Sequence, residues 1–407
     1  MTKKISKALS LFLLAFILFS AILGGTYSLI IPNAVSCSAS GTLPSFPLVS
    51  FSDLQSAPDP DSLDSSTLMT SGISCKLYGI IPLKSVTVSK SRELMLYPGG
   101  MPFGVKFITE GVLVVGFCEV DSSSAQKNPA SEAGIKINDV ITKINGTALS
   151  GASDLTQIVE QSGGRALQLT CTRDGREYST SLTPIYSGSE GKYKTGIYVR
   201  DSGAGIGTVT FIVPESYAFA GLGHGICDAS TGKLIPMQRG SVVDVNISGV
   251  VKGLAGSPGE VKGYFSSGKT GSLLGNTECG VYGIFASKPQ GIHCDPMPVG
   301  GRNELKEGKA YIYSTLEGNT PQKYEIEICN IKRDSSSNKC FTVKVTDPTL
   351  IEKTGGIIQG MSGSPIIQNG KLVGAVTHVL INDPTTGYGI FIENMLNAAQ
   401  MPMQKAA

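Results

Sequence analysis

This 407-residue chain has few charged residues, no closely paired cysteines and few histidines, and each absence excludes or limits a class of function. Charged side chains make up only 16% and the formal net charge is +2, which gives no electrostatic case for binding nucleic acid. No Cys-x-x-Cys pair occurs among the nine cysteines, so zinc and thioredoxin-like sites lack support. We therefore expect no metal and no cofactor. Only three histidines are present, which makes the search for a catalytic base short.

Glycine and proline, in contrast, are abundant, with 50 and 21 residues. This composition suits short strands and many turns, and the length favours two or three domains. We predict a mainly β protein with four regions. These are a membrane segment (1–35), a spacer with a short extended segment (36–95), a small module (96–186) and a larger domain (190–407).

The first region carries three lysines before an uncharged run from Ala8 to Ile31. As a helix, these about 24 residues would be roughly 36 Å long, enough to cross a bilayer. Positive charge before the run places the N-terminus in the cytoplasm and sends the remainder across the membrane. We favour a retained anchor. The small residues Ala34, Val35 and Ser36 leave cleavage as a signal peptide open.

The region 96–186 contains the run Ala-Gly-Ile-Lys-Ile-Asn-Asp-Val-Ile-Thr-Lys-Ile-Asn-Gly, from Ala133 to Gly146. Through this run above all, the region resembles a PDZ domain. PDZ domains add a peptide as an extra strand and hold its carboxylate with the N–H groups of a loop. That loop is expected at Met101, Pro102, Phe103, Gly104 and Val105. Pro102 removes one donor, so a module that serves only as a rigid spacer is the alternative.

In the region 190–407 short strands alternate with glycine turns, a pattern typical of two small β-barrels. The region also contains a serine on a glycine-flanked turn. Gly-Met-Ser-Gly-Ser-Pro, from Gly360 to Pro365, is followed by a strand, an Asn-Gly turn and a second strand. The same order of features closes the second barrel of chymotrypsin-like serine peptidases. We predict Ser362 as the nucleophile and the N–H groups of Gly360 and Ser362 as the oxyanion hole.

A serine nucleophile needs a base, which is usually histidine. His224 lies between glycines about 138 residues before Ser362, a separation that suits one group from each barrel. His378 follows the nucleophile on the next strand and is the less favoured base. For the acid that orients the histidine, spacing alone leaves Asp347, Asp228 and Asp244 open.

Taken in order, these features resemble the stage IV sporulation protein B peptidase family of endospore-forming bacteria. The resemblance rests on the membrane segment, the PDZ-like region, Gly-His-Gly-Ile-x-Asp, Asp-Pro and Gln-Gly-Met-Ser-Gly-Ser-Pro, and it covers essentially the whole chain. It implies a serine endopeptidase with the triad His224, Asp347 and Ser362. It further implies a location at or across the inner forespore membrane, facing the intermembrane space.

The resemblance also implies the substrates. The chain would cleave itself and a membrane-bound regulatory protein, which leads to activation of an intramembrane protease and of a late sigma factor. The alternative is a PDZ adaptor with a decayed, non-catalytic peptidase fold. A heat-shock protease of trypsin fold is disfavoured, because such proteins usually place the PDZ domain after the catalytic domain.

Overall fold

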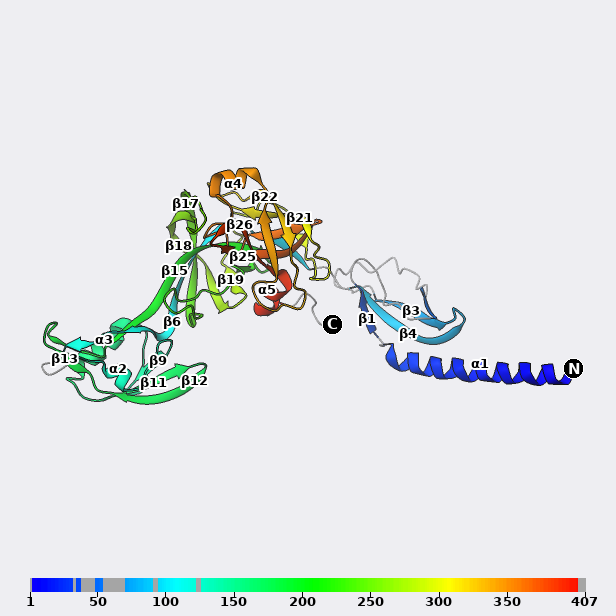
Figure 1. Ribbon diagram of the computed structural model, residues 1–407, viewed down its shortest axis with the longest axis horizontal. Helices are drawn as coiled ribbons and strands as arrows, with labels where there is room; N and C mark the ends of the chain where they lie inside the picture. The colour runs from blue at the N-terminus through cyan, green and yellow to red at the C-terminus, as the bar shows by residue number, and fades with distance from the viewer. Residues whose placement is uncertain are drawn as a thin grey trace. The chain divides into compact units, whose positions relative to one another are not determined.

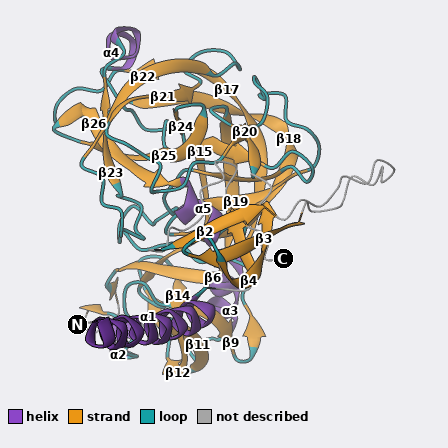
Figure 2. Ribbon diagram, turned by 90° about the vertical axis from the view of Figure 1, so that its right-hand side faces the viewer, coloured by secondary structure: helices purple, strands orange, loops and turns teal. Residues whose placement is uncertain are grey.

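The computed structural model describes residues 2–31, 34–37, 48–53, 70–90, 94–121 and 126–401. The chain forms two compact units, Met1–Leu94 and Met95–Lys405, which are treated separately. Strands, orange in Figure 2, make up most of the regular structure of the second unit. The prediction of a mainly β protein is therefore confirmed.

The first unit pairs one helix with one sheet. It contains α1 (Thr2–Ile30) and a sheet whose strand order is β1 (Ala34–Cys37), β4 (Ile81–Lys90), β3 (Thr70–Leu77) and β2 (Val49–Asp53). Three strands thus lie in the region expected to be mostly spacer, while residues 54–69 fall outside the described residues. Among the described residues no helix is long and apolar enough to span a membrane, and the predicted anchor stays unconfirmed.

The PDZ-like module of the second unit is built around a four-stranded sheet. Its order is β12 (Arg176–Leu182), β11 (Leu167–Arg173), β9 (Val140–Ile144) and the C-terminal half of β6 (Pro102–Phe117). The module also contains β7 (Val120–Asp121), β8 (Gln126–Lys127), α2 (Pro129–Glu132), β10 (Thr147–Ala148), α3 (Ala152–Gln161), β13 (Ile185–Ser187) and β14 (Lys192–Lys194).

Side-chain hydrogen bonds account for the start of this module's first helix and for a charge buried in its core. Asn128 caps α2 through its side chain, and a proline occupies the first turn. The buried carboxylate of Asp139 lies 2.7 Å from Nη2 of Arg173 and accepts from the Tyr178 hydroxyl at 2.6 Å. A buried charge that is paired and hydrogen-bonded in this way is compatible with a folded core.

Two long strands connect the module to the first barrel. β6 and β15 (Ile197–Ile212) pair antiparallel over nearly their whole lengths, from Ile197 opposite Phe117 to Thr208 opposite Pro102. Figure 1 shows the two strands side by side. The first barrel is closed by the ring β6, β17 (Met237–Val251), β18 (Glu260–Thr277), β19 (Gly280–Phe285), β16 (Ala218–Gly221) and β15.

This arrangement overturns the predicted peptide loop of the PDZ-like module. Met101, Phe103 and Val105 are buried in the core of the first barrel, at 6%, 2% and 2% exposure. Pro102 and Gly104 lie in β6, which has β15 on one side and β17 on the other. A strand with neighbours on both edges has no free edge for a peptide, and the barrel begins before the module does.

The second barrel is closed as expected from the sequence. Its order is β21 (Gly308–Ser314), β22 (Gln322–Cys329), β23 (Phe341–Val345), β26 (Asp383–Phe391), β25 (Lys371–Leu380) and β24 (Pro365–Gln368). The Asn369-Gly370 pair joins β24 to β25 with φ angles of 52° and 76°, as a type I′ turn requires. The two helices of this region are α4 (Pro348–Thr354), which comes before the serine turn, and α5 (Ile392–Ala398), which follows β26.

The remaining short strands, β5 (Met95–Pro98) and β20 (Met297–Pro298), pair with each other beside the first barrel. β5 also pairs with the last residues of β15. The two barrels meet where β15 approaches the turn that carries Ser362, because Thr208 of β15 is hydrogen-bonded to that turn.

Candidate active site

The turn that carries Ser362 is held in place by strand β15. The backbone N–H of Thr208 donates to the Ser362 carbonyl at 3.1 Å, and its hydroxyl donates to the Gly360 carbonyl at 2.7 Å. The Thr210 hydroxyl donates to the Gly363 carbonyl at 2.7 Å. A serine turn of the second barrel is thus positioned by hydroxyl groups of the first. This role of Thr208 and Thr210 was not predicted, although the two threonines alternate along one strand.

Close packing leaves room only for glycine after the serine. A Cβ atom on Gly363 would lie 2.0 Å from the Thr208 carbonyl oxygen and 2.5 Å from the Leu222 nitrogen. Gly363 also has a φ of 97°, which side-chain-bearing residues rarely adopt. Leu222 leads into the His224 loop, so the same contact brings the histidine loop against the serine turn.

Two N–H groups of the turn remain available. The N–H groups of Met361 and Gly363 donate to backbone carbonyls at 3.1 and 2.8 Å. Those of Gly360 and Ser362, in contrast, have no hydrogen-bond partner within the described part of the chain. These are the two N–H groups predicted from the sequence to form the oxyanion hole. Unpaired donors held in one turn can stabilise negative charge as it develops.

His224 follows β16 in a tight turn and is oriented by its own neighbour. Its Nδ1 lies 2.9 Å from the carbonyl oxygen of Gly225. Because a carbonyl oxygen can only accept, Nδ1 carries the proton and Nε2 keeps its lone pair in the neutral ring. Burial lowers the pKa of His224 below its ordinary value of 6.5. The ring is therefore neutral at neutral pH, as a general base must be.

Thr377 links the nucleophile to both histidines. The Ser362 hydroxyl donates to the Thr377 carbonyl at 2.7 Å. A Cβ on Gly223, directly before His224, would lie 2.9 Å from the Thr377 methyl carbon. The next residue, His378, packs its ring on that of His224, with centroids 4.8 Å apart and an angle of 35° between planes. No sequence signal distinguished Thr377, whose contribution is a backbone carbonyl.

His378 is less well placed to act as a base than His224. Its Nδ1 is buried and has no hydrogen-bond partner among the described residues. Burial, with smaller contributions from the charges of His224 and Lys339, lowers the pKa of His378 to about 4. Such a ring stays neutral across the physiological range. The uncharged ring of His378 packs against one face of the His224 ring.

The structure does not bring Asp347 to His224. Asp347 is the N-cap of α4, where one carboxylate oxygen accepts from the N–H groups of Thr349 and Leu350 at 2.9 and 3.0 Å. The other oxygen accepts from the Glu325 N–H at 3.2 Å. Both oxygens are therefore occupied by backbone amides, as in a helix cap.

The other two candidate acids are not paired with a histidine either. Asp228 is buried and forms an ion pair with Nη1 of Arg200 at 2.7 Å, while Asp244 is exposed on β17. Within the described ranges no carboxylate forms a hydrogen bond or ion pair with His224 or His378. The partner of the His224 Nδ1 in this structure is thus the Gly225 carbonyl, and the predicted contact of His224 with Asp347 is not formed.

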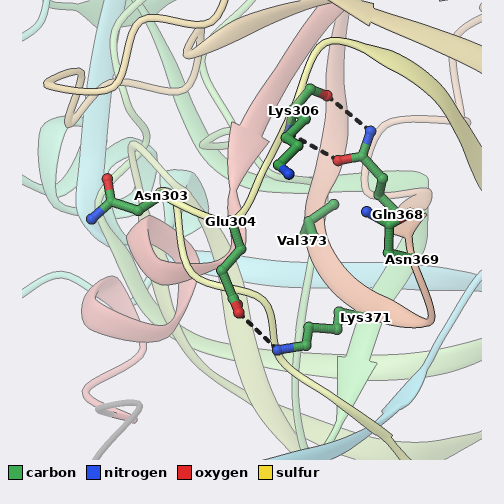
Figure 3. A pocket seen from close by; sticks show the side chains of 7 residues that line it. All are labelled: Asn303, Glu304, Lys306, Gln368, Asn369, Lys371 and Val373. Carbon is green, nitrogen blue, oxygen red and sulfur yellow. Dashed lines mark hydrogen bonds and ion pairs between the residues drawn. The ribbon is translucent and has the colours of Figure 1, made fainter. Parts of the chain in front are cut away.

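A hollow of about 380 Å³ lies apart from these residues, beside the β24–β25 turn (Figure 3). The Gln368 amide bonds to the backbone of Lys306, and Lys371 forms an ion pair with Glu304 at 2.8 Å. None of its lining residues belongs to the serine–histidine cluster. Polar groups that line the hollow bond to one another, so the hollow gives no indication of the reaction that the protein catalyses.

Two family models match the chain, one on each side of about residue 190. A family model described as SpoIVB peptidase S55 matches residues 191–396, and a PDZ-domain model matches residues 99–183. Among solved structures, the PDZ domain of the SdrC-like protein from Listeria monocytogenes is 18% identical, with coverage of 22% of this chain and 87% of that one, at a TM-score of 0.19.

The Rv3671c protease from M. tuberculosis is also similar. Its active form is 15% identical, with coverage of 50% of this chain and 76% of that one, at a TM-score of 0.29. Its inactive form is 14% identical, with coverage of 48% and 84%, at a TM-score of 0.27. Since the S55 model spans half of the chain and includes both the histidine loop and the serine turn, the chain belongs to the SpoIVB peptidase S55 family and is a serine peptidase.

Proposed function

We propose that Ser362 is the nucleophile and His224 the general base of a serine endopeptidase. The observation that carries the proposal is the serine turn itself. It holds two unpaired N–H groups, from Gly360 and Ser362, against a loop that presents a neutral histidine. Acyl transfer needs these three parts together: a hydroxyl, a base and an oxyanion site.

The reaction begins at the serine hydroxyl. In the structure this hydroxyl donates to the Thr377 carbonyl. In the proposed reaction this hydroxyl leaves the Thr377 carbonyl, and Nε2 of His224 takes its proton as Oγ attacks the peptide carbonyl. The N–H groups of Gly360 and Ser362 stabilise the oxyanion. His224 then gives the proton to the leaving amine, and water resolves the acyl-enzyme with the same base.

The Gly225 carbonyl performs part of the work of a triad acid. It fixes the tautomer of His224 and stabilises the charged imidazolium through a hydrogen bond at 2.9 Å. A neutral carbonyl stabilises that charge less than a carboxylate does. We therefore expect a slower peptidase than a Ser–His–Asp enzyme, with a base that needs no residue from α4.

A covalent probe tests the nucleophile directly. The wild-type protein should be labelled by a fluorophosphonate, and mass spectrometry should place the adduct on Ser362. Ser362→Ala should abolish labelling and proteolysis. Ser364→Ala is the matched control, because Ser364 lies two residues away, is fully buried and has no hydrogen-bond partner for its hydroxyl among the described residues. Labelling that survives in Ser362→Ala would overturn the proposal.

We propose, from the family, that the substrates are the chain itself and a membrane-bound regulatory protein of sporulation signalling. Their cleavage would release an intramembrane protease that activates a late sigma factor. The enzyme would act at or across the inner forespore membrane. Exposed apolar side chains on α1 support membrane association; they are Phe12, Leu13, Leu14, Phe16, Ile17, Leu18, Phe19 and Ile22.

N-terminal sequencing of the mature protein tests both self-cleavage and the fate of α1. The wild type should show new N-termini in the predicted spacer, outside the paired strands β2 and β3, because paired backbone is cut less readily. Ser362→Ala should lack them. A vesicle flotation assay on the Ser362→Ala protein measures membrane association without cleavage. Identical N-termini in both proteins would exclude self-cleavage at this site.

A further inference from the structure

We infer that Asn276 is a positioning residue for His224, which it orients through the peptide unit between Gly225 and Ile226. The inference rests on the proposed function, because it takes His224 as the base. Asn276 lies near the end of β18, 50 residues after Ile226 in the sequence. Its side chain reaches the histidine loop from a neighbouring strand of the first barrel.

One peptide unit carries a hydrogen bond on each of its two sides. The Gly225 carbonyl oxygen lies 2.9 Å from Nδ1 of His224, and the Ile226 N–H donates to Oδ1 of Asn276 at 2.8 Å. The C=O and N–H groups of a trans peptide unit lie in one plane and point in opposite directions. The bond to Asn276 therefore fixes the direction of the Gly225 carbonyl, which in turn holds the tautomer of His224.

The backbone of Gly225 does not fix this direction by itself. Glycine has no Cβ atom, so the peptide units beside it rotate more freely than those beside other residues. Packing nevertheless requires glycine here, because a Cβ atom on Gly225 would collide with the Leu234 side chain and lie 2.7 Å from the Thr277 carbonyl oxygen. The orientation of the carbonyl must then come from outside the loop, and Asn276 supplies it.

The Asn276 side chain is itself held in one orientation. Its Nδ2 donates to the carbonyl oxygens of Ile226 and Ile235 at 2.9 and 3.0 Å. A reversed amide would place its NH2 group against the Ile226 N–H and its oxygen against two carbonyl oxygens. The amide oxygen therefore faces the Ile226 N–H, and the Gly225–Ile226 peptide is aligned against a side chain that cannot turn over.

The hairpin beyond Ile226 is also held by other contacts. The Asp228 N–H donates to the Lys233 carbonyl at 2.8 Å, and the buried Asp228 carboxylate forms an ion pair with Arg200 at 2.7 Å. These contacts do not involve Asn276. Loss of the Asn276 side chain should therefore free one peptide unit and leave the rest of the hairpin folded.

Histidine ring NMR and active-site labelling test the inference on the full-length protein. Asn276→Ala removes the acceptor of the Ile226 N–H. We expect the ring-nitrogen chemical shifts of His224 to show loss of the Nδ1–H tautomer. The rate of fluorophosphonate labelling at Ser362 should fall about 100-fold, the effect of misplacing a catalytic group. Only three histidines contribute ring signals, and the signal of His224 is the one lost in His224→Ala.

Asn246→Ala is the matched control. Asn246 is a half-buried asparagine of the same barrel, and its amide donates to the Ser266 hydroxyl at 2.6 Å instead of to the histidine loop. The tautomer of His224 and the labelling rate should match the wild type. If Asn246→Ala changes both as much as Asn276→Ala does, the effect is a general loosening of the barrel and the inference fails.

A second variant covers the case in which Asn276→Ala is misfolded. Asn276→Asp keeps an oxygen acceptor for the Ile226 N–H and loses both donors. A positioning role predicts a less stable protein that keeps the Nδ1–H tautomer of His224 and is labelled at nearly the wild-type rate. A folded Asn276→Asp protein that has lost this tautomer would contradict the inference.

The same measurements separate this inference from the proposed function. If His224→Ala is labelled as fast as the wild type, His224 is not the base and the proposed function fails. If His224→Ala is unreactive while Asn276→Ala keeps both the tautomer and the wild-type labelling rate, the proposed function stands and Asn276 does not position the base.

Discussion

The two barrels each contribute one histidine to the site, and the two rings differ in how they are held. His224 of the first barrel has its Nδ1 fixed by a carbonyl, which leaves Nε2 as an acceptor. His378 of the second barrel has a buried Nδ1 without a described partner. The ring centroids lie 4.8 Å apart, so position alone does not distinguish the roles of the two histidines. Their hydrogen bonds distinguish them, and these favour His224 as the base.

The barrels differ in a second respect, which is how their strands continue. All six strands of the second barrel form a closed ring. The first barrel is also closed, but β6 and β15 continue beyond it into the PDZ-like module. The second barrel thus carries the serine turn, whereas the first carries the His224 loop. The two are joined at Thr208, which is hydrogen-bonded to the serine turn.

The largest expected effect separates the two histidines. His224→Ala should lower kcat/KM about 10⁶-fold, as loss of the base does in serine peptidases. His378→Ala should cost no more than about 100-fold, the effect of slightly misplacing a catalytic group. Steady-state kinetics and the rate of fluorophosphonate labelling measure both. The reverse order, with His224→Ala tolerated, would make His378 the base.

The pH dependence of activity sharpens the same contrast. His224 must be neutral to accept the serine proton, and burial lowers its pKa below 6.5. The acid limb of kcat/KM should therefore lie below pH 6.5, with activity falling about tenfold per unit below the pKa. A limb above pH 6.5 would show that a nearby carboxylate raises the pKa of the base in the active enzyme.

Folding stability reports on His378 in the same pH range. Its pKa is about 4 in the folded protein and near 6.5 in the unfolded chain, so the unfolded chain binds more protons between these values. The stability this neutral ring contributes is complete above pH 6.5 and is lost as the pH falls toward 4. Denaturant unfolding of wild type and His378→Phe at pH 7 and pH 5 should show a smaller loss in the variant. Equal losses would contradict the shift.

The sequence predicted the parts of the site that depend on local pattern. The Asn-Gly turn and the second barrel are confirmed, and Ser362 and His224 lie in adjoining segments as expected. The oxyanion donors and the base remain predictions. The Thr377 and Gly225 carbonyls could not be predicted, because every residue has a carbonyl and only the fold decides which one faces a catalytic group.

The errors have physical causes as well. The sequence of residues 101–105 alternates like any buried strand, and local pattern does not say which sheet that strand joins. Asp347 differs, because its sequence context indicates the contacts that the structure shows. An aspartate followed by proline is a typical N-cap and first helical position, and Asp347 caps α4. Its role as the triad acid remains a prediction.

A smaller effect tests the contact between the barrels. Thr208→Val removes the hydroxyl bond to the Gly360 carbonyl, and Thr210→Val removes the bond to the Gly363 carbonyl. Each should lower the free energy of unfolding by about 1 kcal/mol. Only Thr208→Val should also lower kcat, about tenfold, because Gly360 supplies an oxyanion donor. Equal kcat values in the two variants would remove Gly360 from the oxyanion hole.

The smallest expected effect concerns Asp347, which decides between a helix cap and a triad acid. As the N-cap of α4, Asp347 contributes about 1 kcal/mol, which Asp347→Ala should lose and Asp347→Asn should largely keep. Neither should change kcat more than a few-fold, since the carboxylate bonds to backbone amides and not to His224. Urea unfolding and steady-state kinetics measure the two properties. A folded Asp347→Asn protein with kcat lowered about 10⁴-fold, as when a triad aspartate is lost, would mean that the carboxylate leaves its cap and reaches His224 during catalysis.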